Sequence, residues 1–192
     1  ATGVGIHIQR VAPELVRRGH KVCIITSRRP GEPAVSSWEG ITVYRTFTVK
    51  LYGFYQALPS VSTLQRILRE NGVDIIHCHY LSLLLTRTLK AVRGLDVRRV
   101  YTYHMTVDHL TQPLLMKPLR RLLFRAHVRY CNRFDLILAP SAALMASIRG
   151  YGVTTPVRFL TNPVAFTGDE DGHTDKSSGF VVPVSYTHLT LP

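Results

Sequence analysis

Short apolar runs alternate along this chain with longer segments whose apolar residues recur every three or four positions. The clearest run, 21–26 (KVCIIT), lies between turn residues and is typical of a strand in the middle of a parallel sheet. Similar runs predict strands at 41–46, 74–77, 99–103, 136–139 and 157–160. Helical spacing predicts helices from Ile6 to about Arg18, and at 60–71, 81–92, 113–132 and 142–149. This alternation predicts an α/β fold with a doubly wound parallel sheet, a Rossmann-like arrangement.

Cap and turn residues set the expected ends of these elements. Ser60 and Ser141 have side chains that suit helix N-caps, and Gly19 suits the end of the first helix. Pro13 lies inside that first helix and argues against its second turn. The segment 28–40 is rich in Pro, Gly and Ser, which predicts a loop.

The ends of the chain suggest a fragment. A small-residue turn at 2–5 normally follows a strand, so we expect the first strand of the sheet to be missing. We expect residues 1–167 to form one domain. The segment 168–183 would hold a linker, the polar and acidic stretch 168–179, and the start of a second domain, whose first strand would be 180–182. Residues 184–192 (VSYTHLTLP) resemble a translated sequencing-library adapter and are left out of the fold prediction.

Composition excludes two broad classes of protein. With 45% hydrophobic residues, 9 Tyr and 7 Phe the chain can build a core, so it is not intrinsically disordered. Its apolar stretches, such as 81–85, fall far short of the roughly 20 residues that a membrane span requires. The three cysteines have apolar neighbours and form no C-x-x-C pair, which favours buried, reduced thiols in a cytosolic protein.

Candidate chemistry lies where the predicted strands end, because open parallel sheets bind ligands at their carboxyl edge. Gly3 and Gly5 stand before the first helix, where small residues let backbone N–H groups approach a phosphate; a plain tight turn is the alternative. The absence of an acid after strand 21–26 argues against a dinucleotide site. Asn162 could hold a loop through bonds from its side chain to the backbone.

Histidines end two further strands. His77 and His79 are two residues apart and point to one face of a strand, but no acidic or cysteine cluster completes a metal site, so we expect a polar lining and no metal. His104 ends strand 99–103, where an imidazole can exchange a proton or orient a hydroxyl. The alternative is a strand-end histidine bonded to the backbone.

Basic residues concentrate on the helix predicted at 113–132. The chain has 24 Lys and Arg against 12 Asp and Glu, a net charge of +12. Lys117, Arg121, Arg125, Arg129 and Arg133 belong to this helix region, and the last four recur every four residues as one stripe. Leu119, Leu123, Ala126 and Tyr130 are expected on the opposite face. An anionic membrane surface fits this stripe better than nucleic acid, because no nucleic-acid-binding motif accompanies the charge; an ordinary solvated helix is the alternative.

These segments together resemble the N-terminal half of a family 4 glycosyltransferase of the GT-B fold. The family's Gly-Gly-x-x-x-His opening is similar to residues 2–7 (TGVGIH), and its Arg-Gly-His-x-Val to 18–22. Its Asp-x-x-His-x-His is matched by 74–79, and its Thr-x-His by 102–104. The chain departs from the family at Thr2, where the family has glycine, and at 161–165 (TNPVA), where it has Pro-Asn-Gly-Val-Asp.

The resemblance implies a retaining transferase that moves a sugar from a nucleotide sugar to an acceptor between two Rossmann-like domains, with no cofactor and no metal. By the same resemblance, the donor or substrate would be bound by Gly3, Gly5, His7, His79 and Asn162. His104 would lie near the transferred sugar. The acceptor is a membrane lipid or another carbohydrate, and the pattern also resembles transferases that act on phosphatidylinositol. Such an enzyme would sit at the cytoplasmic face of a membrane, and the fragment alone would be inactive. The alternative is a non-catalytic Rossmann-like module that binds a nucleotide or a partner.

Overall fold

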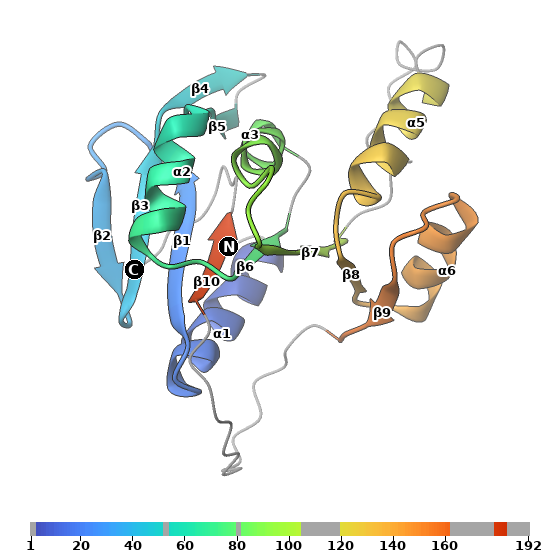
Figure 1. Cartoon of the computed structure of the whole chain (residues 1–192), viewed down its shortest axis with the longest axis horizontal. Coiled ribbons are helices and arrows are strands. Elements are labelled where there is room, and N and C mark those ends of the chain that lie inside the picture. Colours follow the sequence, from blue (N-terminus) through green and yellow to red (C-terminus); the bar gives the residue numbers. More distant parts are fainter. Residues whose placement is uncertain (1–2, 52–53, 80–81, 105–119, 162–178, 184–192) are drawn as a thin grey trace. The chain divides into compact units, whose positions relative to one another are not determined.

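The computed structural model describes residues 3–51, 54–79, 82–104, 120–161 and 179–183 (Figure 1). The chain divides into two compact units, which we call the first unit (Ala1–Val97 with Asn162–Pro192) and the second unit (Arg98–Thr161). The two units are described separately below. Their α/β content confirms the predicted fold class.

The first unit is built on a mostly parallel sheet with the strand order β2-β3-β1-β10-β6. The strands are β1 (Lys21–Ser27), β2 (Val35–Trp38), β3 (Ile41–Thr46), β6 (Ile75–Cys78) and β10 (Gly179–Pro183). Only β2 runs antiparallel, beside β3 at the edge. A separate antiparallel hairpin is formed by β4 (Thr48–Leu51) and β5 (Phe54–Ala57). The prediction of a loop over 28–40 was therefore wrong at β2, and the hairpin was not predicted.

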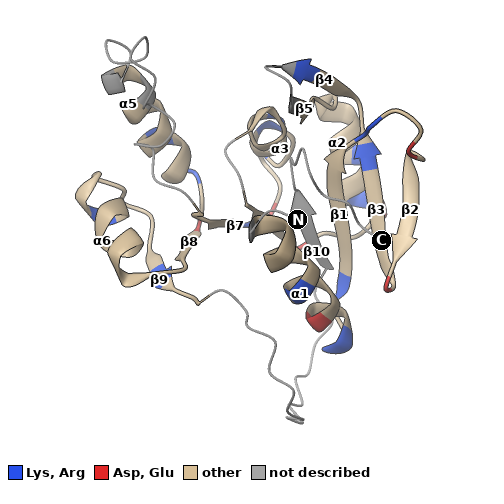
Figure 2. Ribbon diagram, turned by 180° about the vertical axis from the view of Figure 1, so that it is seen from behind, with Lys and Arg blue, Asp and Glu red and all other residues tan. Residues whose placement is uncertain are grey.

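Helices cover both faces of this sheet. Figures 1 and 2 show α1 (Gly3–Arg17) on one face and α2 (Val61–Glu70) with α3 (Leu83–Ala91) on the other. The predicted cap at Ser60 is confirmed, since its hydroxyl oxygen accepts a hydrogen bond from the Thr63 N–H at 3.0 Å. Ser82 caps α3 in the same way. A sheet with helices on both faces is the doubly wound arrangement.

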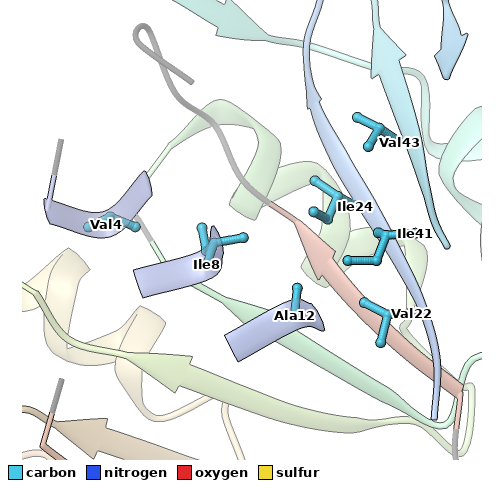
Figure 3. Close-up of a cluster of buried hydrophobic side chains, with 7 residues drawn as sticks. All are labelled: Val4, Ile8, Ala12, Val22, Ile24, Ile41 and Val43. Atoms are coloured by element: carbon cyan, nitrogen blue, oxygen red, sulfur yellow. The ribbon is translucent and has the colours of Figure 1, made fainter. Parts of the chain in front are cut away.

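The core on the α1 face explains why α1 continues past its proline. Val4, Ile8 and Ala12 occupy one side of the helix at four-residue spacing and pack against β1 and β3 (Figure 3). Burying each large aliphatic side chain contributes about 1.5–3 kcal/mol, comparable to the roughly 3 kcal/mol that an internal proline costs a helix. The helix therefore runs through Pro13, and the expected disruption of its second turn was wrong.

The strand at the centre of the first unit comes from the far end of the chain. We expected residues 180–182 to open a second domain, and they do form a strand, β10. Its backbone, however, pairs in parallel with β1 on one side and with β6 on the other. β10 thus supplies the central strand between the two, where we had expected a strand to be missing. The division of the chain at 167 and 183 stays a prediction, because residues 162–178 and 184–192 lie outside the described part.

The second unit is a three-stranded parallel sheet with two described helices. Its strands are β7 (Arg98–Thr102), β8 (Leu136–Ala139) and β9 (Val157–Phe159), in that order. The helices are α5 (Arg120–Cys131) and α6 (Ala142–Gly150). Each of these elements lies within a predicted one or overlaps it closely. The Ser141 cap of α6 is also confirmed.

Side-chain hydrogen bonds tie the end of α5 to the loop before β9. The Asn132 side-chain oxygen accepts a hydrogen bond from the Thr154 N–H at 2.8 Å. The Thr155 hydroxyl donates to the carbonyl oxygens of Cys131 and Phe134. The bond to Cys131 gives a partner to a carbonyl group in the last turn of α5, which the helix itself leaves without one.

Candidate functional site

Three histidines gather in the first unit. His7 comes from α1, His77 lies on β6, and His79 directly follows β6. Their side chains are 3%, 9% and 2% exposed. The ring centres of His77 and His79 are 4.0 Å apart, and those of His7 and His79 are 5.3 Å apart. The shared face of His77 and His79 is confirmed; that His7 joins them depends on the packing of α1, which no spacing in the sequence reveals.

The first turn of α1 leads directly to this histidine cluster. The expected turn at 2–5 is wrong for the described residues, because α1 begins at Gly3 and Gly5 is already helical and buried. His7 lies one turn after Gly3. The first turn of α1 holds no acidic residue. A helix N-terminus carries a partial positive charge and unused N–H groups, so this turn together with imidazole donors suits an anion such as a phosphate.

No metal centre accompanies the cluster in the part of the chain that the structure describes. There, no group of three or more His, Cys, Asp or Glu side chains has an arrangement that could hold a metal ion. The three cysteines are free and buried, as predicted. Burial raises the pKa of the Cys23 thiol to about 12, so this thiol stays protonated and does not act as a metal ligand or nucleophile at neutral pH.

His104 lies in the second unit, just past the end of β7, and is half-buried. The residue before it, Tyr103, is completely buried, and its N–H donates to the Leu138 carbonyl oxygen at 2.8 Å. This bond continues the pairing of β7 with β8 and fixes the backbone from which His104 extends. The structure therefore places His104 at the carboxyl end of a parallel strand, as the sequence predicted.

An aromatic group packs around the end of β7. Tyr101 stacks on Phe134 with ring centres 5.1 Å apart, and it meets Tyr103 edge-to-face at 6.0 Å. The His127 ring of α5 also makes an edge-to-face contact with Tyr103, with ring centres 5.3 Å apart. His127 was not singled out from the sequence. Its only signal there is its position one helical turn before Cys131.

His127 is a buried, neutral imidazole. It is 4% exposed, and burial lowers its pKa from 6.5 to about 4, because a charged ring would lose its hydration. One ring nitrogen, Nε2, lies 3.4 Å from the Cys131 sulfur. The other, Nδ1, has no hydrogen-bond partner among the described residues. Such a residue is not an ideal part of an apolar core.

The basic face of α5 is confirmed in part. Arg125 and Arg129 of α5 are exposed, and Figure 2 shows blue positions along this helix. Arg133 is also exposed, but it lies in the turn just after the helix ends at Cys131. Lys117 and the side chain of Arg121 lie outside the described residues. Leu122 on the same face is 65% exposed. The predicted inner face was wrong at Ala126, which is exposed, and missed His127 and Cys131, which are buried. A four-residue repeat turns about 40° around a helix with each step, so the basic face extends as far as Ala126.

Charge in the second unit is strongly one-sided. Its 64 residues hold ten Lys and Arg against two Asp and Glu, a net +8 of the chain's +12. Within its described residues the one carboxylate is that of Asp135, which binds Arg99 at 2.8 Å. Hydrogen bonds from Arg99 lower the pKa of Asp135. Among the described residues of the second unit, no other carboxylate therefore remains to pair with the arginines of α5.

The fold and the order of these segments match a known enzyme family. The sequence model of the family Glycosyltransferase Family 4 matches residues 1–166 of this chain. The chain therefore belongs to glycosyltransferase family 4 and is part of a transferase.

A solved structure supports the fold. A sucrose-phosphate synthase structure from Thermosynechococcus elongatus resembles the chain with a TM-score of 0.55 at 15% identity, over 84% of this chain and 86% of that one. At this identity the likeness shows the GT-B N-terminal fold alone. No curated protein matches the chain.

Two further expectations concern a membrane span and Asn162. In the described residues, no helix is long and apolar enough to cross a bilayer. Asn162 lies outside the described part of the chain, so its expected role in a loop stays a prediction.

Proposed function

We propose that this chain is the acceptor-side half of a retaining glycosyltransferase that moves a sugar from a nucleotide sugar to a membrane lipid. The observation that carries the proposal is the packing of His7, His77 and His79 beside the acid-free first turn of α1, in a chain that belongs to glycosyltransferase family 4. Cleavage of a nucleotide sugar leaves negative charge on a diphosphate. Helix N–H groups and imidazoles are suited to stabilise that charge.

Each named residue has a proposed role in this transfer. Gly3 and Gly5, which lack side chains, would let the donor diphosphate or its sugar approach the backbone of α1. His7 and His79 would hydrogen-bond the same ligand, and Asn162 would hold the loop beyond β9. His104 would contact the transferred sugar and the acceptor hydroxyl, as a polar group that assists the transfer. None of these roles requires a cofactor or a metal ion, and their absence stays a prediction.

The test of the catalytic role is an assay of UDP or GDP release from UDP- and GDP-sugars by the natural full-length protein. His104→Ala should reduce transfer by at least about ten-fold, the scale of general acid–base or polar assistance. His20→Ala, a half-buried histidine of the first unit, is the matched control and should leave turnover unchanged. Near-wild-type transfer by His104→Ala would remove His104 from the site. No turnover with any nucleotide sugar by the folded protein would contradict the enzyme function itself.

The lipid acceptor and the membrane location are supported by the exposed basic face of α5. Arg125, Arg129 and Arg133 present positive charge to anionic headgroups, and the exposed Leu122 beside them can contact the acyl boundary. Each basic residue near an anionic surface contributes about 1 kcal/mol. This supports a peripheral position at the cytoplasmic face of a membrane, with phosphatidylinositol as the first acceptor to test.

The membrane role is tested with sedimented vesicles of phosphatidylcholine and phosphatidylserine. Reversing Arg125, Arg129 and Arg133 to Glu should weaken binding by at least about 100-fold, since three contributions of about 1 kcal/mol are lost. The control reverses Arg66, Arg69 and Arg93, three exposed arginines of the first unit, with the same change in net charge. Equal losses in the two variants would show that net charge alone drives binding, and the α5 surface would have no specific role.

A further inference from the structure

The aromatic packing at the end of β7 assigns a role to His127. We propose that His127 is a positioning residue for His104: its ring holds Tyr103 in place, and Tyr103 fixes the backbone from which the His104 side chain extends. The catalytic consequence rests on the proposed function of His104, but the positioning itself does not. All the residues concerned belong to the second unit.

The contacts form a short chain from α5 to the strand end. The His127 and Tyr103 rings meet at 5.3 Å with an angle of 71° between their planes. Edge-to-face pairs of this kind restrict both rings and are worth about 0.5–1.5 kcal/mol beyond their buried area. Tyr103 is 0% exposed, and its N–H is bound to Leu138 of β8. Tyr103 therefore has little freedom as long as the His127 ring stays in place.

The ring of His127 is also in contact with its own helix. Its Nε2 lies 3.4 Å from the Cys131 sulfur, one turn further along α5. Around Cys131, the Thr155 hydroxyl donates to the Cys131 carbonyl oxygen at 3.0 Å and joins this end of α5 to the loop before β9. The ring of His127 is thus fixed at both ends, by Cys131 on its own helix and by Tyr103 on the sheet.

The properties of His127 favour positioning over simple core packing. Its Nδ1 is buried without a partner among the described residues, which costs stability that an apolar residue would not lose. Its side chain is 4% exposed, and its ring lies against Tyr103 and beside the Cys131 sulfur. A buried polar ring beside the strand end that carries His104 is therefore better explained by the geometry it imposes than by the stability it adds.

The experiment measures the imidazole of His104 directly by NMR in the 192-residue chain labelled at histidine, with the His104 signals assigned from His104→Gln. His127→Ala should move the His104 ring resonances and change its measured pKa by at least about 0.5 pH unit, because the hydration and hydrogen bonds of an imidazole set its pKa. His127→Phe, which keeps an aromatic ring against Tyr103, should restore values close to wild type. No catalytic turnover is needed for this measurement.

The matched control is Phe124→Ala. Phe124 lies one turn before His127 on the same helix, and its ring makes an edge-to-face contact with Tyr151, with ring centres 4.8 Å apart. It should leave the His104 resonances unchanged. If His127→Ala does not fold, His127→Leu removes the ring at similar volume and is judged by the same criteria. Unchanged His104 signals in the ring-free variant, or equal changes in Phe124→Ala, would overturn the proposal.

The two proposals fail separately. In the natural full-length protein, His127→Ala should lower kcat with little change in KM for the donor, and His127→Phe should restore kcat. If the NMR signals of His104 move but kcat does not, His127 positions His104 and the proposed catalytic role of His104 is wrong. If His104→Ala abolishes transfer but the NMR signals are unaffected by His127→Ala, the function stands and the positioning role is wrong.

Discussion

Acid should destabilise the second unit through His127. In the folded chain burial lowers the pKa of His127 from 6.5 to about 4, whereas in the unfolded chain the ring is hydrated and keeps its ordinary pKa. At pH values between these two pKa values, His127 binds a proton in the unfolded state but stays neutral in the folded state. Stability is therefore complete above about pH 6.5 and is lost as the pH falls toward 4.

The size of this loss follows from the two pKa values. A difference of about 2.5 pH units at about 1.36 kcal/mol each gives an upper limit of about 3.4 kcal/mol, reached below pH 4. At about pH 5 the unfolded ring is almost fully protonated and the folded ring is mostly neutral, which lowers the free energy of unfolding by about 2 kcal/mol. This is a large share of the stability of a small domain.

The assay compares wild type with His127→Phe, which fills the site with a ring that cannot be protonated. Urea unfolding followed by circular dichroism at about pH 8 and about pH 5 gives the free energy of unfolding of each protein. Other groups titrate equally in both proteins, so the difference between their pH dependences isolates His127. Trp fluorescence is the internal control, because the single Trp, Trp38, lies in the first unit and therefore reports on the unit that does not contain His127. Equal loss of stability in the two proteins between these pH values would refute the reasoning.

Three further predictions concern stability. Asn132→Ala should cost about 1 kcal/mol, because it removes the acceptor of the Thr154 N–H, and the midpoint of urea unfolding measures the loss. Val181→Pro should cost more than about 1 kcal/mol, because a central strand cannot lose a ladder donor, and Trp38 fluorescence during unfolding reports it; an unchanged midpoint would mean that β10 is not held between β1 and β6. Asp135→Asn should destabilise the chain more at neutral pH than at about pH 3, because the stabilisation by Arg99 is present above the ordinary pKa of the carboxyl and is lost as acid protonates it.

The local pattern of residues was sufficient for most elements. Apolar runs and serine caps predicted β1, β8, α2 and α6 almost to the residue, because these signals act within one turn or one strand. Spacing alone placed His77 and His79 on one face, since alternate residues of a strand share a side. It also placed His104 at a strand end and arginines on the exposed face of α5.

Tertiary structure decided what depends on distant partners. Pro13 is accepted inside α1 because the burial of Val4, Ile8 and Ala12 outweighs its local cost. Residues 180–182 form a strand in either reading, but only the backbone partners offered by β1 and β6 make it the centre of the first unit.

The same division applies to the candidate site. The sequence by itself determined the residue types that phosphate and hydroxyl chemistry needs, the family to which they belong, and the strand ends on which they lie. Only the packing of α1 brought His7 to His79, and only the packing of α5 turned His127 inward against Tyr103. Helical periodicity fixes which residues share a face, but the face that is buried is chosen by the apolar and aromatic surface it meets.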